Sequence, residues 1–414
     1  MKHLLLAFSF LPCLGFAQSI PTTEWELKTE FATCPEMAGS SYYAYPGPKQ
    51  KQYTPAPKGY EAVYISHYGR HGSRWITEDK RYQYVLDTLD HYGLSDFGKE
   101  LRQRLEPVWQ DAKGRSGELT KIGEQQHHDI AQRMMTNYPS LFTGKKYIRA
   151  YASTVRRCMM SMMAFCEGLK ELNPELKIER SAYERDMDFV NYESPELKQL
   201  TNKKGEWYQQ YLKYREQNMN PSRVMGLIFW RPEELGDPIG LMEELYWIAV
   251  NMQDTPLHHN FFDLFTNNEL YNIWKVINYR MYVTNSGSVV GKGIPAASAQ
   301  SLLDQIISSA DEALKNGDTS ATLRFGHDSA LIRLLTRMKI DGCNAVVDNP
   351  EELPFVWQDF RISPMAANLQ IIFYQNKQRQ TLVKFLLNEN EVTLPIQSKF
   401  SPYYNWEDVK TFWK

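Results

Sequence analysis

Residues Arg70 to Arg74 form the sequence Arg-His-Gly-Ser-Arg, which places two guanidinium groups and one imidazole within five positions. Arginine makes bidentate, charge-assisted bonds to phosphate oxygens, so Arg70 and Arg74 predict a local phosphate site. His71 between them is a candidate nucleophile that takes a phosphoryl group onto a ring nitrogen. That nitrogen must be unprotonated, and the neighbouring cations lower the histidine pKa. The alternative for an isolated Arg-His-Gly is an exposed basic turn.

Two further segments carry polar residues at the point where a strand-like run passes into a helix-like run. Arg157 follows the strand-like run 146–152 and lies in the first turn of a predicted helix. From there it can reach a ligand beyond the carboxyl end of the strand, where open α/β sheets bind ligands. His327 and Asp328 follow the run 321–325, so His327 can bond the transferring oxygens and Asp328 can protonate a leaving alcohol. The alternatives are a solvated arginine and a helix N-cap.

The histidine doublets His127-His128 and His258-His259 do not have the spacing of metal ligands on a helix. Adjacent helical residues point about 100° apart, whereas ligand pairs on one face are separated by four positions. The chain also lacks a Walker loop, a Gly-x-Ser-x-Gly elbow and a His-Glu-x-x-His motif. We therefore expect neither a metal site nor a cofactor.

The elements around these motifs predict an α/β fold. The strand-like runs 62–66, 146–152 and 321–325 each precede one of the three motifs, and helix-like segments follow. Three further strand-like runs near the C-terminus have hairpin spacing: 367–374, 381–387 and 391–394. Strand–loop–helix units at both ends favour a three-layer α/β core around a central, mostly parallel sheet.

The middle of the chain is different, because residues from about 175 to 305 are rich in aromatics and contain few strand-like runs. We interpret residues 173–305 as an α-helical insertion or cap domain, and residues 18–172 and 306–414 as the core. Within that core, residues 18–60 are expected to form an extended leader that wraps a domain. Thr120 and the pair Ser153-Thr154 are expected to cap helices.

Composition limits the class of partner. The chain has 414 residues, 43% of them apolar and 13% aromatic, with a net charge of −2. Such a balance provides no global basic field for nucleic acid or an anionic membrane, so anion recognition must be local. A small phosphomonoester is the expected partner, and the oligomeric state is left open.

The N-terminus has the pattern of a secretory signal peptide, assigned to residues 1–17. Lys2 and His3 precede an apolar run, and small residues stand at positions −3 and −1 before Gln18. The run is too short to span a membrane, so we expect export to the periplasm or beyond. The alternative is a lipoprotein signal that uses Cys13, which Pro12 fits poorly.

Four cysteines remain after the leader: Cys34, Cys158, Cys166 and Cys343. An exported protein with four cysteines can form up to two disulfides in three pairings. Cys158 and Cys166 share a predicted helix, where eight residues separate them by about 12 Å, too far for a direct bond. The pairing is left open.

The three motifs together resemble the histidine acid phosphatase branch of the histidine phosphatase superfamily. Arg70 to Arg74 match its Arg-His-Gly-x-Arg motif, Arg157 before Cys158 matches its third arginine, and His327-Asp328 matches its acid motif. The resemblance implies that the three arginines grip the scissile phosphate beside His327. It also implies that His71 forms a phosphohistidine and that Asp328 donates the proton, without a metal.

Within that branch the chain looks most like the multiple inositol polyphosphate phosphatases and the histidine acid phytases. The resemblance spans about residues 60–410 and is carried by the stretches 153–169, 262–270, 365–369 and 387–389. Two positions depart from the pattern. Trp75-Ile76 replace an aromatic residue and proline, and His327-Asp328-Ser329 replaces the His-Ala-Glu of the inositol polyphosphate enzymes.

The resemblance implies phosphate ester hydrolysis, with inositol polyphosphates such as phytate as the expected substrates. A broad-specificity acid phosphatase or a sugar phosphatase is the alternative within this class. A non-catalytic protein that binds a phosphate ligand on the same fold is the alternative from another class. Basic residues of the insertion are candidates for further phosphate contacts, with ordinary surface charge as the alternative: Lys203, Lys204, Arg223, Arg231 and Lys292.

Overall fold

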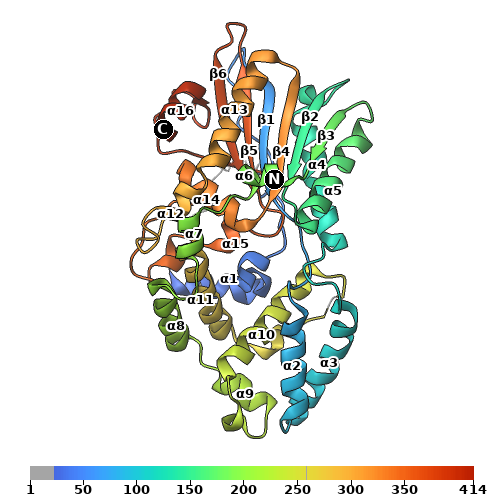
Figure 1. Ribbon diagram of the computed structural model, residues 1–414, viewed down its shortest axis with the longest axis vertical. Helices are drawn as coiled ribbons and strands as arrows, with labels where there is room; N and C mark the ends of the chain where they lie inside the picture. The colour runs from blue at the N-terminus through green and yellow to red at the C-terminus, as the bar shows by residue number, and fades with distance from the viewer. Residues whose placement is uncertain (1–22, 258) are drawn as a thin grey trace, which may run out of the picture.

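The computed structural model describes residues 23–257 and 259–414. The predicted signal peptide, the Cys13 alternative and His258 of the second doublet lie outside these residues. Within them, the centre of the molecule is an eight-stranded sheet in the order β3-β2-β4-β1-β5-β6-β7, with β8 paired to β6 (Figure 1). The strands are β1 Glu61–Arg70, β2 Tyr147–Ala152, β3 Lys177–Ser181, β4 Thr319–Gly326, β5 Asn368–Gln375, β6 Thr381–Leu387, β7 Asn390–Val392 and β8 Tyr404–Asn405.

The sheet is mixed, and its two halves follow from their connections. Strands β3, β2, β4 and β1 are parallel neighbours, whereas β5, β6 and β7 continue the sheet in antiparallel pairs. Parallel neighbours need long crossovers, which the helices provide, whereas the short turns near the C-terminus can only join antiparallel strands. The predicted α/β class is confirmed. The edge strand β3 lies where the sequence suggested few strands.

Helices cover both faces of the sheet (Figure 1). Helices α4 Lys121–Asn137 and α5 Arg156–Leu172 pack together on one face, and α13 Gln300–Asn316 and α14 Asp328–Met338 lie on the other. Alternate residues of a strand point to opposite faces. Accordingly Tyr64 and Tyr68 of β1 belong to one hydrophobic cluster, and Ile65 belongs to the other. This is the three-layer arrangement that the sequence predicted.

A helical lobe extends from the end of the sheet where the three motifs lie (Figure 1). Its helices come from two parts of the chain, since α2 and α3 pack against α10 and α9 of the predicted insertion. The helices of this lobe are α2 Asp79–His91, α3 Asp96–Ala112, α8 Glu206–Asn218, α9 Ser222–Ile228, α10 Pro238–Asn251 and α11 Asn267–Asn285. Shorter helices are α6 Met187–Val190, α7 Pro195–Leu200, α12 Ile294–Ser298, α15 Asp359–Ile362 and α16 Trp406–Trp413. The 3₁₀ turns are η2 Pro139–Leu141, η3 Glu184–Asp186, η4 Pro232–Glu234, η5 Met252–Asp254, η6 Phe262–Leu264 and η7 Leu353–Phe355.

The segment before β1 is helical in its first part, so the expectation of an extended leader is wrong there. Helix α1 spans Glu24–Thr33 and the 3₁₀ segment η1 spans Pro35–Tyr42. A capping box starts α1, because the Thr23 hydroxyl accepts from the amide of Glu26 and the Glu26 carboxylate accepts from the amide of Thr23. The Thr-x-x-Glu spacing was visible in the sequence and outweighs the neighbouring turn-forming residues.

Two capping predictions have opposite outcomes. Thr120 caps α4, and its hydroxyl accepts from the Gly123 amide at 3.3 Å. The pair Ser153-Thr154 does not cap α5, whose N-cap is Val155 without any side-chain cap. The Ser153 hydroxyl instead lies 3.2 Å from a ring nitrogen of His327, across the sheet edge. A tertiary contact thus replaces the local hydrogen bond that the sequence favoured.

The four cysteines after residue 22 form no disulfide. In the described part of the chain Cys34, Cys158, Cys166 and Cys343 are all free, and all but Cys34 are buried. Burial raises the pKa of Cys166 and of Cys343 to about 12, so both are protonated thiols that pack as small apolar groups.

Candidate active site

The three motifs meet at one edge of the sheet, because they follow the carboxyl ends of three parallel neighbours. Strand register aligns Arg70 of β1 with Gly326 of β4, and Phe325 of β4 with Ala152 of β2. The backbone continues this pairing past the strands, since the His71 amide donates to the Gly326 carbonyl at 3.0 Å. The sheet therefore brings the nucleophile candidate, the acid candidate and the start of α5 together.

His71 lies at the centre of this edge and is 2% exposed. Its ring centroid lies 5.7 Å from that of His327, with the two planes nearly perpendicular. Nδ1 lies 2.9 Å from the Gly72 carbonyl, which can only accept a hydrogen bond. This contact requires the proton on Nδ1, so it leaves the Nε2 lone pair available for attack.

The environment of His71 keeps its ring neutral. Burial, followed by the positive charges of Arg70, Arg157 and Arg74, holds the pKa of His71 well below its ordinary value of 6.5. The sequence predicted a lowered pKa for His71 from the arginines alone, and the structure adds burial as the larger cause of this shift. The nucleophile candidate is therefore unprotonated at neutral pH and takes up a proton only at a more acidic pH than an ordinary histidine.

The three arginines keep buried N–H groups that have no partner within the described residues. These are the Nε groups of Arg70, Arg74 and Arg157. Arg70 is fully buried, and its Nη2 forms an ion pair with Asp328 at 3.2 Å. Buried donors without acceptors are costly and rare in folded proteins. Three of them at one place, each on a cation, fit an anion with several oxygen atoms.

Helix α5 adds to the positive potential of this edge. The 17-residue helix begins at Arg156 and has neither a side-chain cap nor an acidic residue in its first turn. Its first amide groups and the positive end of its dipole therefore remain available to an anion near Arg157.

Asp328 is the first residue of α14, and its carboxylate accepts from the Ser329 amide at 2.7 Å. Helix α14 has His327 as its N-cap without a side-chain bond, so neither Asp328 nor Ser329 is the N-cap. Burial favours a raised pKa for Asp328, but Arg70 and then His327 outweigh it and lower that pKa to about 2. An anion bound to Arg70 competes for this guanidinium and adds negative charge, and both changes raise the Asp328 pKa towards that of a proton donor.

His327 is held by residues that sequence reasoning did not assign to the site. Its Nε2 lies 3.2 Å from the Ser153 hydroxyl and 3.7 Å from the Cys158 sulfur. Burial and then Arg157 lower the pKa of His327 to about 4, so the ring is neutral and carries one N–H donor. The position of Ser153 between β2 and α5 was visible in the sequence, but its partner was not.

The loop between Arg70 and Arg74 is also held from the helical lobe. The Ser73 hydroxyl donates to Asp254 at 2.5 Å, and the Asn251 amide donates to the Arg74 carbonyl at 2.8 Å. Asp254 is fully buried, and burial raises its pKa to about 7. No motif in the sequence singled out Asp254 or Asn251.

The basic residues proposed for further phosphate contacts do not join this cluster. Arg223 pairs with Glu269 and lines a polar cavity of about 190 Å³ whose lining contains no residue of the three motifs. Arg231 pairs with Glu234 at the surface. The remaining three side chains are exposed: Lys203, Lys204 and Lys292.

Comparison with known proteins identifies the family. The model of the histidine phosphatase superfamily (branch 2) matches residues 69–225 and 242–388. The chain belongs to this superfamily branch. It is thus a hydrolase of the histidine acid phosphatase type, acting on small phosphate esters. All three motifs lie within the matched ranges, whereas α1 and η1 precede them.

Solved structures of an inositol polyphosphate phosphatase and of phytases share the fold at low identity. The multiple inositol polyphosphate phosphatase of Bifidobacterium longum, in complex with inositol hexasulfate, is 18% identical with a TM-score of 0.77 over 91% of this chain and 97% of that chain. The phytase from D. castellii is 17% identical with a TM-score of 0.65 over 91% and 84%. A Hafnia alvei phytase in complex with myo-inositol hexakis sulphate is 13% identical with a TM-score of 0.54 over 86% and 96%.

Two further findings concern the described ranges of this phosphatase, 23–257 and 259–414. No helix there is long and apolar enough to cross a bilayer. No three His, Cys, Asp or Glu side chains gather there in an arrangement that could hold a metal ion.

Proposed function

We propose that the protein is an exported phosphomonoester hydrolase that works through a phosphohistidine on His71 and acts on inositol polyphosphates. The observation that carries the reaction is the contact between His71 Nδ1 and the Gly72 carbonyl, which leaves Nε2 as the attacking atom. The unpartnered Nε groups of Arg70, Arg74 and Arg157 support a phosphate at the same place.

The first half of the proposed reaction transfers the phosphoryl group to the protein. The three arginines hold the equatorial oxygens, and the neutral His327 donates its N–H to one of them. Nε2 of His71 attacks phosphorus in line, so a P–N bond forms while the P–O ester bond breaks. Asp328 gives its proton to the leaving oxygen, which departs as an alcohol.

The second half returns the protein to its starting state. Asp328, now a carboxylate, accepts a proton from a water molecule that attacks the phosphorus of the phosphohistidine. The P–N bond breaks, Nε2 regains its lone pair, and inorganic phosphate leaves. The proton on Asp328 restores the acid for the next substrate.

His71→Ala tests the nucleophile. We expect the purified, folded variant to lose turnover by about 10³-fold or more, as for other essential nucleophiles. Incubation of the wild type with ³²P-labelled substrate and an acid-labile, base-stable label on His71 would separate the hydrolase from a binding protein. Wild-type hydrolysis by a folded His71→Ala protein would refute the assignment.

Asp328→Asn tests the acid. A general acid contributes about 10²- to 10⁴-fold when the leaving group is a poor one. We expect a loss of this size with alkyl and inositol phosphates and a much smaller loss with an aryl phosphate, whose leaving group needs little protonation. Equal losses with both substrates would remove the acid role.

The substrate class rests on likeness to the inositol polyphosphate phosphatases and phytases, and a direct screen tests it. Phosphate release from phytate, a sugar phosphate and an aryl phosphate should be compared at equal concentrations. We expect phytate to have the highest kcat/KM. A phytate rate no better than the others would favour the broad-specificity or sugar phosphatase alternative.

Export is tested on the protein expressed from its full sequence. Cell fractionation followed by N-terminal sequencing should find the mature chain outside the cytoplasm with Gln18 as its first residue. A lipid-modified cysteine at the mature N-terminus would support the Cys13 alternative instead.

A further inference from the structure

The end of η1 contains a backbone conformation that glycine favours and that a serine occupies. Ser40 has φ 57° and ψ −135°, and it is fully buried. A residue with a side chain adopts such angles only where its surroundings hold it there, and such residues gather at functional sites. Ser40 lies outside the three motifs and before the residues that the superfamily model matches.

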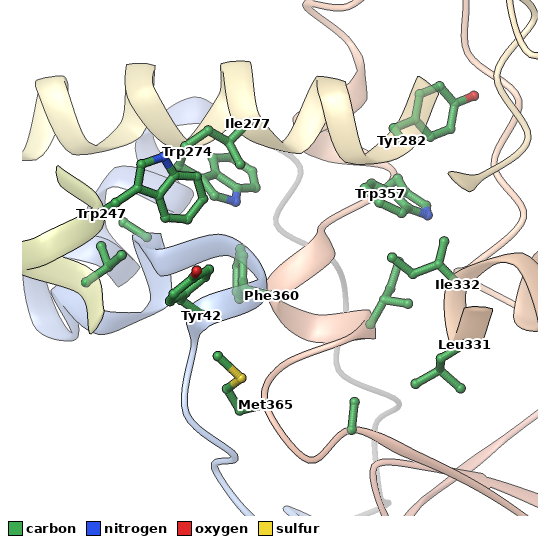
Figure 2. Packing of buried hydrophobic residues seen from close by; sticks show 14 of the residues in the cluster. Tyr42, Trp247, Trp274, Ile277, Tyr282, Leu331, Ile332, Trp357, Phe360 and Met365 are labelled. Carbon is green, nitrogen blue, oxygen red and sulfur yellow. The ribbon is translucent and has the colours of Figure 1, made fainter. Parts of the chain in front are cut away.

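Asp359 at the start of α15 holds Ser40 in place. The Ser40 hydroxyl donates to Oδ2 of Asp359, which is itself fully buried. Oδ1 of the same carboxylate accepts from Trp274 Nε1 at 3.0 Å and from the Phe360 amide at 2.8 Å. Figure 2 shows Trp274 and Phe360 close together, with Tyr42 beside Phe360. Asp359 thus cannot move without disturbing its packed neighbours.

The two residues after Ser40 contact Arg70 and Arg74. The Ser41 carbonyl accepts from Nη1 of Arg70. The Tyr42 hydroxyl accepts from Nη1 of Arg74 at 2.9 Å, and the Tyr42 ring lies 4.6 Å from that guanidinium. The strained turn at Ser40 therefore determines where both acceptors lie.

Asp359 also acts on Arg70 from the opposite direction. Its backbone carbonyl accepts from the Ser363 amide at 2.8 Å, and the Ser363 carbonyl accepts from Nη1 of Arg70 at 2.7 Å. Nη1 of Arg70 is thus occupied by two backbone carbonyls, both linked to Asp359. Its Nε and Nη2 remain for an anion and for Asp328.

We propose that Ser40 and Asp359 are positioning residues that orient Arg70 and Arg74 for phosphate binding. This inference rests on the proposed function of the same site. Holding Nη1 fixes the plane of the Arg70 guanidinium, so that its other N–H groups face the phosphate. Without this anchor the guanidinium can rotate towards its Asp328 ion pair and leave the phosphate with fewer donors.

Ser40→Gly is the main test, because glycine accepts the backbone angles and removes only the hydroxyl link. We expect kcat/KM for an aryl phosphate to fall about 10- to 100-fold, as for a misplaced binding group. Inhibition by inorganic phosphate should weaken by a similar factor. Asp359→Asn keeps the shape of the side chain, and its amide can donate to the Ser40 hydroxyl, so we expect this variant to retain most of the activity. Asp359→Ala removes the link and should lose activity.

A double-mutant cycle with Arg70→Ala separates positioning from a general structural role. If Ser40 acts through Arg70, Ser40→Gly costs little more once Arg70 is absent. Ser286→Ala, which removes a buried hydroxyl bonded to Thr336 and Cys343, is the matched control and should keep wild-type kinetics.

Two results would overturn the inference. One is wild-type kcat/KM and phosphate inhibition in Ser40→Gly. The other is an equal loss from Ser40→Gly in the wild type, in Arg70→Ala and in Arg74→Ala, because the loss would then run through neither arginine. Calorimetric titration with inorganic phosphate gives the same comparison without turnover. Failure of the His71 reaction would therefore not hide the outcome for Ser40.

Discussion

The acid sensitivity of this protein can be tested at His127, a buried residue that the proposed reaction does not use. His127 lies on α4, is 1% exposed, and packs against the rings of Phe325 and Phe165 at 5.6 and 6.5 Å. Burial lowers its pKa from 6.5 to about 3. We predict that His127→Phe, which keeps a ring in this place, makes the protein less sensitive to acid.

The magnitude follows from proton linkage. Below pH 6.5 the unfolded chain binds a proton at His127 that the folded protein does not bind until about pH 3. The contribution of the neutral His127 to the free energy of unfolding is therefore fully present above pH 6.5. Below pH 6.5 it falls by about 1.4 kcal/mol per pH unit. Between pH 7.5 and 4.5 the loss due to His127 is about 2.5 kcal/mol. His127→Phe should lack this part of the loss.

Urea unfolding at pH 7.5 and at pH 4.5 measures the effect. The difference between variant and wild type at pH 7.5 reports packing and the lost hydrogen bond between His127 and the Arg70 backbone, because the histidine is neutral in both states there. At pH 4.5 the free energy of unfolding of the variant, relative to that of the wild type, should be about 2.5 kcal/mol higher than at pH 7.5. An equal difference at both pH values would refute the reasoning, since it would mean that folding does not change the protonation of His127.

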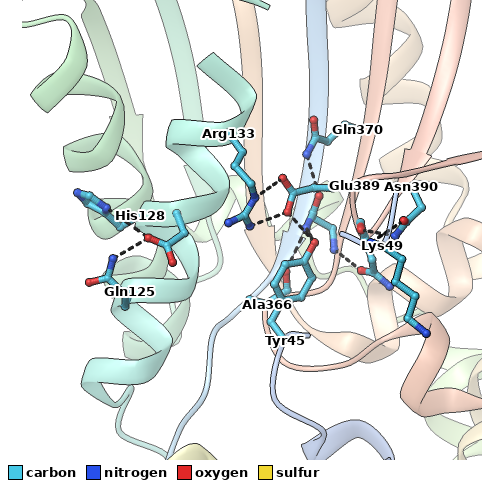
Figure 3. Close-up of polar contacts among 12 residues, drawn as sticks. Tyr45, Lys49, Gln125, His128, Arg133, Ala366, Gln370, Glu389 and Asn390 are labelled. Atoms are coloured by element: carbon cyan, nitrogen blue, oxygen red, sulfur yellow. Dashed lines mark hydrogen bonds and ion pairs between the residues drawn. The ribbon is translucent and has the colours of Figure 1, made fainter. Parts of the chain in front are cut away.

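Three further substitutions test other contacts. In Gly72→Ala the new Cβ would lie 2.5 Å from the Gly123 carbonyl oxygen. We therefore expect the free energy of unfolding to fall by about 1–3 kcal/mol and kcat/KM to fall as well. Unchanged kinetics and an unchanged melting temperature would contradict this close approach. Arg133→Met leaves the buried Glu389 without the cation shown in Figure 3. We expect the free energy of unfolding in urea to fall by about 2 kcal/mol, a value reduced because Arg133 is partly exposed. An unchanged free energy of unfolding would show that Glu389 needs no partner. Burial raises the pKa of Asp254 from 3.8 to about 7, so the folded protein binds a proton that the unfolded chain releases, and stability falls as pH rises through this range. Between pH 4 and pH 8 the free energy of unfolding of Asp254→Asn should rise relative to that of the wild type by up to about 4 kcal/mol. A difference between the two proteins that stays constant with pH would contradict this prediction.

Local sequence was sufficient for the main elements of the core. The strand before His71 and the strand before His327 were predicted because short apolar runs ended at polar motifs, and both strands are present. The parallel order then follows from the helices between them, so the meeting of these motifs at one sheet edge was predictable as well. Thr120 was a correct cap because its partner lies only three residues away.

Other predictions failed where a distant contact outweighed a local preference. Ser153 is a good N-cap residue, yet its hydroxyl contacts His327, 174 positions away. The segment before β1 contains many turn-forming residues, yet part of it is helical, and the strained Ser40 lies within its 3₁₀ segment. The pattern of neighbours along the chain contains no information about such partners.

The sequence by itself determined which residues could do phosphate chemistry and the order in which strands would deliver them. Arg70, His71 and Arg74 are adjacent in the chain, so their proximity needed no tertiary argument. The tertiary structure decided what acts on them: the burial that lowers the pKa of His71, and the buried carboxylates Asp254 and Asp359 behind the loop. Burial and hydrogen bonding between distant segments exist only once the chain is packed, and for this reason no local pattern reveals them.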